Sequence, residues 1–248
     1  MIRPLEAGEV RVWWMDLGLA EDTEIARWRE CLDPAEQAQA DRFHFAADRQ
    51  TYIAAHWLVR EALASVDGLP PADWRFVVEK RGKPAVDPAL DRRDLRFNLS
   101  HTRGFVACAV SLGITLGIDV EPLSRAATGA DIAKRFFSPS ELSILRAVNE
   151  DRQAATFLRF WTLKEAFIKA TGEGLYRPLD SFSFSLEPVS IAFEPEDADD
   201  PSSWTFFELR PTPAYLLALA IRHSGPLKLS TCPLQLPGRE RHQGPGST

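Results

Sequence analysis

The stretch Gly117-Ile118-Asp119-Val120-Glu121 combines an alternating apolar pattern with two acidic side chains. Successive side chains of a β-strand point to opposite faces, so Asp119 and Glu121 share one face while Ile118 and Val120 point into the core. Two neighbouring buried carboxylates repel each other and lose hydration unless a cation lies between them. Since Mg²⁺ prefers oxygen ligands of this kind, the pair indicates a divalent metal site. The alternative on spacing alone is a solvated strand end with two surface acids.

Residues 154–170 contain apolar and aromatic side chains on most faces of a predicted helix, together with Lys164, Glu165 and Lys169. Such a helix is expected to be largely buried, where charged side chains are costly unless they are paired or bound. We therefore expect Glu165 to be a third carboxylate ligand, in a site where lysines accompany a phosphate ester. The alternative is an ordinary surface ion pair, because Glu165 and Lys169 lie four residues apart.

The composition is that of a soluble globular protein, with 248 residues, of which 45% are hydrophobic and 26% charged. A net charge of −6 argues against nonspecific nucleic-acid binding. The cysteines Cys31, Cys108 and Cys232 form no CxxC pair and are expected to be reduced thiols. With no apolar signal core and no run of about 18 apolar residues, we expect a cytoplasmic protein without a membrane partner.

The order of predicted elements indicates an α+β fold of two similar halves. Strands are expected over 10–17, 74–79, 95–101, 105–111, 115–121, 182–186, 204–209 and 215–221, with a helix as the alternative for the last. Helices are expected over 34–42, 48–64, 139–148 and 154–170. The halves are predicted at 1–112 and 113–224, with a ligand cleft between them, and 225–248 as a flexible tail.

Two further segments carry polar groups at the ends of predicted strands. Ser100 and His101 end one strand, and residues 81–84 (Arg-Gly-Lys-Pro) form a predicted turn. Adjacent serine and histidine side chains seldom reach the geometry of nucleophilic attack, but both can donate hydrogen bonds to phosphate oxygens. A structural histidine is the alternative. Arg49 and His56 lie seven residues apart on one face of a predicted helix, where a solvated face is the default.

Together these segments resemble the 4′-phosphopantetheinyl transferases, specifically the larger, surfactin-type class. The combination of Gly-Ile-Asp-Val-Glu with Trp-x-x-Lys-Glu-x-x-x-Lys is highly specific, and the resemblance runs from about residue 42 to 221. The matching stretches are 42–43 with 48–49, 82–84, 97–101, 117–121, 134–138 and 161–169. The resemblance implies a pseudo-dimer of two fused halves, each a small, mostly antiparallel sheet packed against a long helix.

The resemblance also implies an activity, that of a holo-[acyl-carrier-protein] synthase. Such an enzyme transfers 4′-phosphopantetheine from coenzyme A to a serine of an acyl or peptidyl carrier protein and releases 3′,5′-ADP. Asp119, Glu121 and Glu165 match the ligands of Mg²⁺, for which Mn²⁺ is the alternative, and Glu165 is the candidate general base. Lys169 matches a lysine that stabilises phosphoryl charge. The implied coenzyme A contacts are Arg49, Arg81, Gly82, Lys83, Pro84, Ser100, His101, Asp119 and Lys169.

One departure concerns residues 36–41, which are Glu-Gln-Ala-Gln-Ala-Asp where some members of the family carry basic residues. The coenzyme A 3′-phosphate must then be held from elsewhere, with Arg42, Arg49 and His56 as candidates. Residues 134–137 (Lys-Arg-Phe-Phe) combine basic and apolar side chains suited to an acidic carrier protein, with a plain amphipathic helix as the alternative. Two fused halves predict a monomer.

Two other function classes remain open at this level. One is a Mg²⁺-dependent pyrophosphohydrolase, which would turn over coenzyme A or a nucleotide without a protein acceptor. The other is a nonenzymatic module that binds coenzyme A or a nucleotide and releases nothing. Incubation with coenzyme A, Mg²⁺ and a carrier protein that lacks the phosphopantetheinyl group separates these classes from a transferase.

Overall fold

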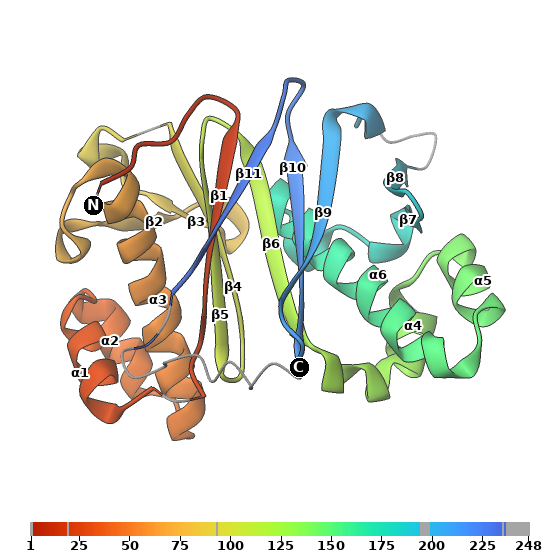
Figure 1. Ribbon diagram of the computed structural model, residues 1–248, viewed down its shortest axis with the longest axis horizontal. Helices are drawn as coiled ribbons and strands as arrows, with labels where there is room; N and C mark the ends of the chain where they lie inside the picture. Colours follow the sequence, from red (N-terminus) through yellow and green to blue (C-terminus); the bar gives the residue numbers. More distant parts are fainter. Residues whose placement is uncertain (1, 19, 93, 194–198, 235, 237–248) are drawn as a thin grey trace, which may run out of the picture.

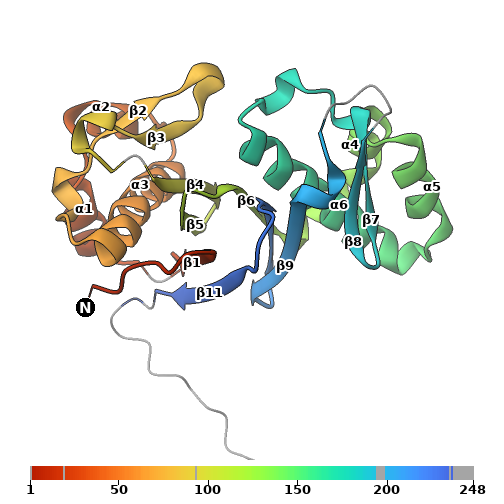
Figure 2. The same cartoon turned by 90° about the horizontal axis from the view of Figure 1, so that it is seen from above.

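The computed structural model describes residues 2–18, 20–92, 94–193, 199–234 and 236. These residues form two α+β halves whose sheets lie side by side in the middle of the molecule, with helices on the outer faces (Figures 1 and 2). One apolar cluster lies between each sheet and its long helix, and a third lies between the two sheets. The predicted α+β fold of two similar halves is therefore confirmed.

The sheet of the N-terminal half has the strand order β11-β1-β5-β4, and the long helix α3 (Ala46–Asp67) packs against it. The antiparallel part consists of β1 (Glu9–Asp16), β5 (Phe105–Leu112) and β4 (Leu95–Thr102). Two shorter helices, α1 (Asp22–Glu30) and α2 (Pro34–Asp41), and the hairpin of β2 (Phe76–Val78) with β3 (Pro84–Val86) surround α3. Asp33 caps α2 through the backbone N–H groups of Ala35 and Glu36, as its sequence predicts.

The sheet of the C-terminal half has the strand order β6-β10-β9, from β6 (Thr115–Pro122), β10 (Tyr215–Arg222) and β9 (Trp204–Thr212). Its long helix is α6 (Glu150–Thr171), which packs against β6 and β10. The other elements of this half are α4 (Gly129–Phe136), α5 (Pro139–Ala147) and the hairpin of β7 (Phe182–Leu186) with β8 (Val189–Phe193). The segment 215–221 is a strand, which excludes the helical alternative.

The prediction of a flexible tail from residue 225 is wrong for β11 (Lys228–Pro233). This strand returns to the N-terminal half and pairs in parallel with β1, with Val10 opposite Leu229 and Trp13 opposite Cys232. Its six residues show little apolar alternation, because they form the outer strand of the sheet and are only partly buried. Residues 235 and 237–248 of the predicted tail lie outside the described residues.

Strand β6 lies between the two halves and sets the position of its acidic residues. Ile118 and Val120 belong to the apolar cluster between the sheets, so the intervening Asp119 and Glu121 point to the opposite face, towards α6. Gly117 brings β6 against the α6 backbone, because a Cβ atom there would lie 2.1 Å from the carbonyl oxygen of Ala166. None of the described helices is long and apolar enough to cross a lipid bilayer.

Candidate active site

A cavity of about 250 Å³ at the junction of the two halves contains most of the predicted site residues. Strand β4 contributes Ser100 and His101, β6 contributes Asp119 and Glu121, and α6 contributes Glu165 and Lys169 from adjacent turns. The complete lining is Ser100, His101, Thr102, Asp119, Val120, Glu121, Arg125, Trp161, Glu165 and Lys169. Three carboxylates from a strand and a helix thus meet in one cavity, as the sequence predicts.

The two carboxylates of β6 are buried, with Asp119 4% and Glu121 5% exposed, which excludes a solvated strand end. Asp119 Oδ1 accepts hydrogen bonds from Lys169 Nζ at 2.6 Å and from Ser100 Oγ at 3.0 Å. Glu121 Oε1 accepts from the Arg125 guanidinium and from Trp161 Nε1, the latter at 3.1 Å. The second oxygens, Asp119 Oδ2 and Glu121 Oε2, are buried and have no hydrogen-bond partner. Such orphaned oxygens are costly, and they fit a cation that would lie beside β6.

The carboxylates are not drawn together as they would be around a metal ion. Within the described residues, no three of the His, Cys, Asp and Glu side chains are grouped closely enough to hold one. The positive charges of Arg125 and Lys169 are instead bound to Glu121 and Asp119. The two oxygens without partners fit Mg²⁺ chemically, whereas Glu165, the expected third ligand, is not grouped with them closely enough to share an ion.

Burial and neighbouring charges shift the pKa values of three side chains in this cavity. Burial, together with the charges of Asp119 and Glu121, raises the pKa of Glu165 to about 7, against the opposing effect of Lys169. Burial and the Asp119 charge also raise the pKa of Glu121. Loss of hydration and the Lys169 charge lower the pKa of His101, which favours a neutral imidazole. Groups perturbed in this way, clustered in one cavity, are typical of active sites.

Two residues of the motifs are structural rather than part of the cavity. Lys164 is fully buried, and its Nζ donates to Glu141 Oε2 at 2.9 Å and to the carbonyl oxygens of Leu179 and Phe182. The expectation that Lys164 accompanies a phosphate ester is therefore wrong, because its charge is neutralised inside the C-terminal half. Phe137 is also buried, and its ring stacks on that of Phe157, so it is not available to a carrier protein.

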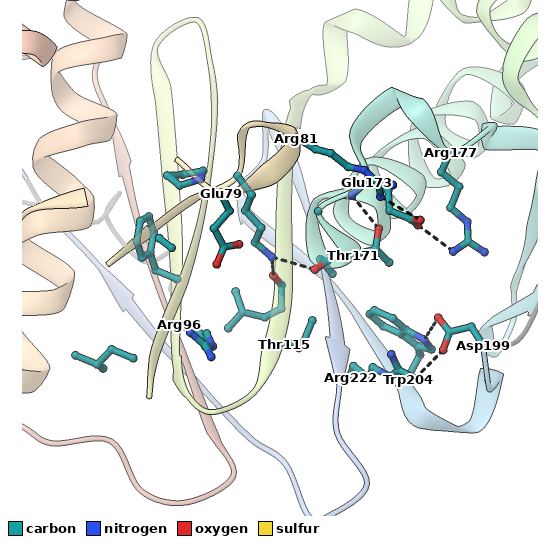
Figure 3. A pocket seen from close by; sticks show the side chains of 18 residues that line it. Glu79, Arg81, Arg96, Thr115, Thr171, Glu173, Arg177, Asp199, Trp204 and Arg222 are labelled. Atoms are coloured by element: carbon teal, nitrogen blue, oxygen red, sulfur yellow. Dashed lines mark hydrogen bonds and ion pairs between the residues drawn. The ribbon is translucent and has the colours of Figure 1, made fainter. Parts of the chain in front are cut away.

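The predicted turn 81–84 lies at a second cavity, a groove of about 740 Å³ at the other end of the same junction. Figure 3 shows Arg81 and Arg177 on either side of Glu173, with Arg81 Nη1 3.5 Å and Arg177 Nη1 3.1 Å from its carboxylate oxygens. Asp199 lies beside Trp204 and Arg222 in the same groove. The residues that the resemblance assigns to coenzyme A are therefore separated: Ser100, His101, Asp119 and Lys169 line the first cavity, whereas Arg81, Lys83 and Pro84 line this groove.

The individual positions within the turn explain its shape. Arg81 has φ 73° and Gly82 has φ 92°, a left-handed pair that reverses the chain between β2 and β3. Lys83 Nζ donates to the carbonyl oxygens of Leu116 at 3.3 Å and Ala170 at 2.9 Å, both in the C-terminal half. Pro84 lines this groove and also a third cavity. Arg49 is exposed on the first turn of α3 and lines none of the three.

The third cavity, of about 290 Å³, lies in the N-terminal half and was not found from the sequence. Its walls are aromatic and apolar, and the Tyr52 ring lies 4.1 Å from that of His56. His56 Nδ1 is 2.9 Å from Glu36 Oε1, and hydrogen bonds from His56 and Arg60 overcome burial and lower the pKa of Glu36 to about 2. The complete lining is Asp33, Ala35, Glu36, Tyr52, His56, Val59, Phe76, Val77, Val78, Pro84, Phe97 and Leu99.

Arg125 and Trp161 also line the first cavity, although no pattern in the sequence indicates a site role for them. Directly after β6 follows a 3₁₀ segment (Leu123–Thr128). It carries Arg125, whose guanidinium lies 5.4 Å from the centroid of the Trp161 ring. Both bind the same oxygen of Glu121. The signal in the sequence was the basic residue four positions after Glu121, but this spacing is informative only if a helical turn follows the strand.

The sequence of this chain is similar to those of known proteins of one family. A model described as "4′-phosphopantetheinyl transferase, N-terminal" matches residues 20–112, and one for the "4′-phosphopantetheinyl transferase superfamily" matches residues 115–220. The transferase HetI of Nostoc sp. is 33% identical, covering 89% of this chain and 91% of its own. A 4′-phosphopantetheinyl transferase of Bacillus subtilis is 38% identical, covering 81% of this chain and 81% of its own. The transferase Sfp of Bacillus subtilis strain 168 is 34% identical, covering 85% of this chain and 90% of its own.

A solved structure gives a weaker comparison. The holo-[acyl-carrier-protein] synthase of Thermotoga maritima is 21% identical and covers 45% of this chain and 65% of its own. The TM-score of this comparison is 0.37.

Proposed function

Because this chain belongs to the 4′-phosphopantetheinyl transferase family, we propose that it transfers 4′-phosphopantetheine from coenzyme A to a serine hydroxyl of an acyl or peptidyl carrier protein. In this reaction the serine oxygen forms a bond to the β-phosphorus of coenzyme A, and the bond from that phosphorus to 3′,5′-ADP breaks. The main support is the cavity in which Glu165, with a pKa of about 7, faces the buried acids of β6 and the ammonium of Lys169. Because one chain supplies both walls, a monomer suffices.

Mg²⁺ is the cation we expect at Asp119 Oδ2 and Glu121 Oε2, with Glu165 as a further ligand. Mn²⁺ accepts the same oxygen ligands. The two buried oxygens without partners support this assignment. When bound, the cation supplies positive charge that offsets the charge of the donor pyrophosphate.

Three side chains of the first cavity have distinct roles in the proposed reaction. Glu165 accepts the proton of the incoming serine hydroxyl, for which a pKa near 7 is well matched to neutral pH. Lys169, bound to Asp119 at 2.6 Å, holds a positive charge where the phosphoryl oxygens gather negative charge. His101 donates a hydrogen bond to the pyrophosphate as a neutral imidazole, consistent with its lowered pKa.

We propose that the third cavity, which has aromatic walls, binds the adenosine of coenzyme A. Phe97 and Leu99 of β4 line it, and His101 is the next residue on the same face of that strand. A ligand lying along β4 could therefore extend from the third cavity to His101 and to the first cavity, which contains the three carboxylates. Apolar and aromatic walls suit a purine ring. Glu36 is ionised on one wall, so the 3′-phosphate is expected to point away from α2.

The test of the proposed function is an incubation of the full chain with coenzyme A, Mg²⁺ and a carrier protein in its unmodified form. Transfer adds the mass of one phosphopantetheinyl group to the carrier, and 3′,5′-ADP appears in equal amount. Cleavage of coenzyme A without a mass gain would assign the protein to the pyrophosphohydrolases instead. Binding of coenzyme A without any product would indicate a nonenzymatic module.

Metal binding is expected to weaken as the pH falls below about 7. The folded-state pKa of Glu165 is raised, so below about 7 its carboxyl carries a proton that a metal ion must displace. The Mg²⁺ dissociation constant should rise up to tenfold for each pH unit below about 7, measured by titration calorimetry without substrate. In Glu165→Gln this part of the pH dependence should be absent. Binding by the unaltered protein that is independent of pH between 5.5 and 8.5 would contradict the role of Glu165.

An acidic carrier protein is expected to dock on α4 beside the cavity. Lys134 and Arg135 are exposed there, and Phe136 lies against Trp161 of the cavity wall, with ring centroids 6.0 Å apart. Arg135→Glu should raise the KM for the carrier several-fold and leave the KM for coenzyme A unchanged, because the reversed charge repels an acidic surface. Kinetics with the carrier varied at saturating coenzyme A measure this, and an unchanged carrier KM would move the docking site elsewhere.

A further inference from the structure

Among the described strands, none pairs with the edge of β6 that faces the N-terminal half. In its own sheet β6 is paired with β10 alone, so the backbone groups on its other edge need partners from outside the sheet. Strand β4 lies next to this edge but belongs to the other sheet. The contact between the two halves therefore depends on how the free edge of β6 is satisfied.

Three side chains of the N-terminal half satisfy this edge at every second residue. Lys83 Nζ donates to the Leu116 carbonyl oxygen at 3.3 Å. Asn98 Oδ1 accepts from the Ile118 N–H at 2.9 Å, and Ser100 Oγ accepts from the Val120 N–H at 3.2 Å. We call these three residues, Lys83, Asn98 and Ser100, the seam. Asn98 and Ser100 alternate along β4 and Lys83 comes from the β2–β3 turn, so that side chains take the place of the backbone ladder of a continuous sheet.

Both ends of the seam also contact α6. Lys83 Nζ also donates to the Ala170 carbonyl oxygen at 2.9 Å, in the last turn of α6 and next to Lys169. Ser100 Oγ donates to Asp119 Oδ1 at 3.0 Å and accepts from Lys169 Nζ at 2.9 Å. A hydroxyl has one hydrogen and two lone pairs, so the Val120, Asp119 and Lys169 contacts use the whole capacity of Ser100.

We propose that the seam positions β6 and α6 relative to each other, so that Lys83 and Ser100 act on catalysis through Asp119 and Lys169 rather than as ligands of coenzyme A. This inference rests on the proposed function and changes the role that the family resemblance implies for both residues. Ser100 is 4% exposed, and the Lys83 ammonium donates hydrogen bonds to two carbonyl oxygens of the other half. Asn98, to which the resemblance gives no coenzyme A contact, belongs to the same row.

The test compares Lys83→Met and Ser100→Ala with Asn98→Ala, which serves as the internal standard for a pure seam defect. Coenzyme A and 3′-dephospho-coenzyme A are used as donors in parallel. A seam residue should lower kcat roughly 10- to 100-fold with both donors, because small misplacements of reacting groups are costly. The ratio of kcat/KM between the donors should stay within twofold of the unaltered enzyme. Lys83→Arg, which keeps a donor, should restore most of kcat.

Hydrogen exchange followed by mass spectrometry gives a readout that does not depend on activity. In Asn98→Ala and Ser100→Ala, the peptide that covers residues 115–122 should exchange at least about tenfold faster, because the Ile118 or Val120 N–H loses its acceptor. If Lys83→Met raises the KM for coenzyme A but not for the dephosphorylated donor, Lys83 is a 3′-phosphate ligand and the proposal fails. Unchanged exchange in β6 would also overturn it. Failure of the unaltered protein to modify any carrier would instead count against the proposed function.

Discussion

Replacement of Glu165 by glutamine is expected to lower kcat for carrier modification by roughly 10²–10⁴-fold, the range that a positioned general base contributes. Glutamine keeps the size of the side chain but cannot accept the serine proton, and it is a weaker metal ligand than a carboxylate. Initial rates of carrier mass gain at saturating coenzyme A and Mg²⁺ measure the effect. Glu30→Gln, on the exposed face of α1, is a matched control that should leave kcat unchanged.

The same substitution should stabilise the metal-free fold at alkaline pH. The folded-state pKa of Glu165 is about 7, above its ordinary value of 4.5, so folding favours the protonated form. The favourable contribution is present below about pH 4.5 and is lost as the pH rises to 7, where the charged group meets Asp119 and Glu121. Calorimetry without metal should therefore show a higher Tm for Glu165→Gln at pH 8 and a smaller difference at pH 5. Near-normal turnover of Glu165→Gln at saturating Mg²⁺ would remove Glu165 from the mechanism.

Local patterns in the sequence were sufficient to predict the strand and the helix that contain the active-site residues. Alternation placed Asp119 and Glu121 on one face of a strand, and the apolar helix around Glu165 is buried as expected. The capping sequence at Ser138 likewise predicted the start of α5, where Ser138 Oγ accepts from the Glu141 N–H. These features depend on residues close together in the chain, so their physics is visible in the sequence.

Contacts between distant segments could not be predicted in the same way. Lys164 and Lys169 lie on the same helix, yet Lys164 neutralises Glu141 inside the protein while Lys169 reaches Asp119. The difference is set by what packs against each face of α6, and no local pattern records it. The same holds for Lys83, whose partners Leu116 and Ala170 are 33 and 87 residues away. A lysine in a turn is ordinarily solvated, so its contact with carbonyl groups of the other half has no signature in the sequence.

Gly117→Ala is expected to destabilise the protein by at least about 3 kcal/mol, the upper part of the range for overpacked sites. An added Cβ would lie 2.1 Å from the Ala166 carbonyl oxygen and 2.4 Å from the Ala170 backbone nitrogen. Both atoms belong to the α6 backbone, so no change of side-chain rotamer relieves the overlap. Strand β6 and helix α6 must move apart, which separates Asp119 from Lys169. Denaturant unfolding monitored by tryptophan fluorescence measures the loss of stability.

The activity of Gly117→Ala should fall further than its stability explains. In the fraction that remains folded, a displacement of about 1 Å between β6 and α6 lowers kcat roughly 100-fold, since Asp119 and Glu121 lie on β6 whereas Glu165 and Lys169 lie on α6. Gly113→Ala is the matched control. Gly113 has φ 65° and no atom within 4 Å of an added Cβ, so alanine costs only about 1–2 kcal/mol of backbone strain there. Its kcat should be unchanged. If Gly117→Ala folds as stably as Gly113→Ala and keeps full activity, close contact between β6 and α6 is not what holds the acidic cavity together.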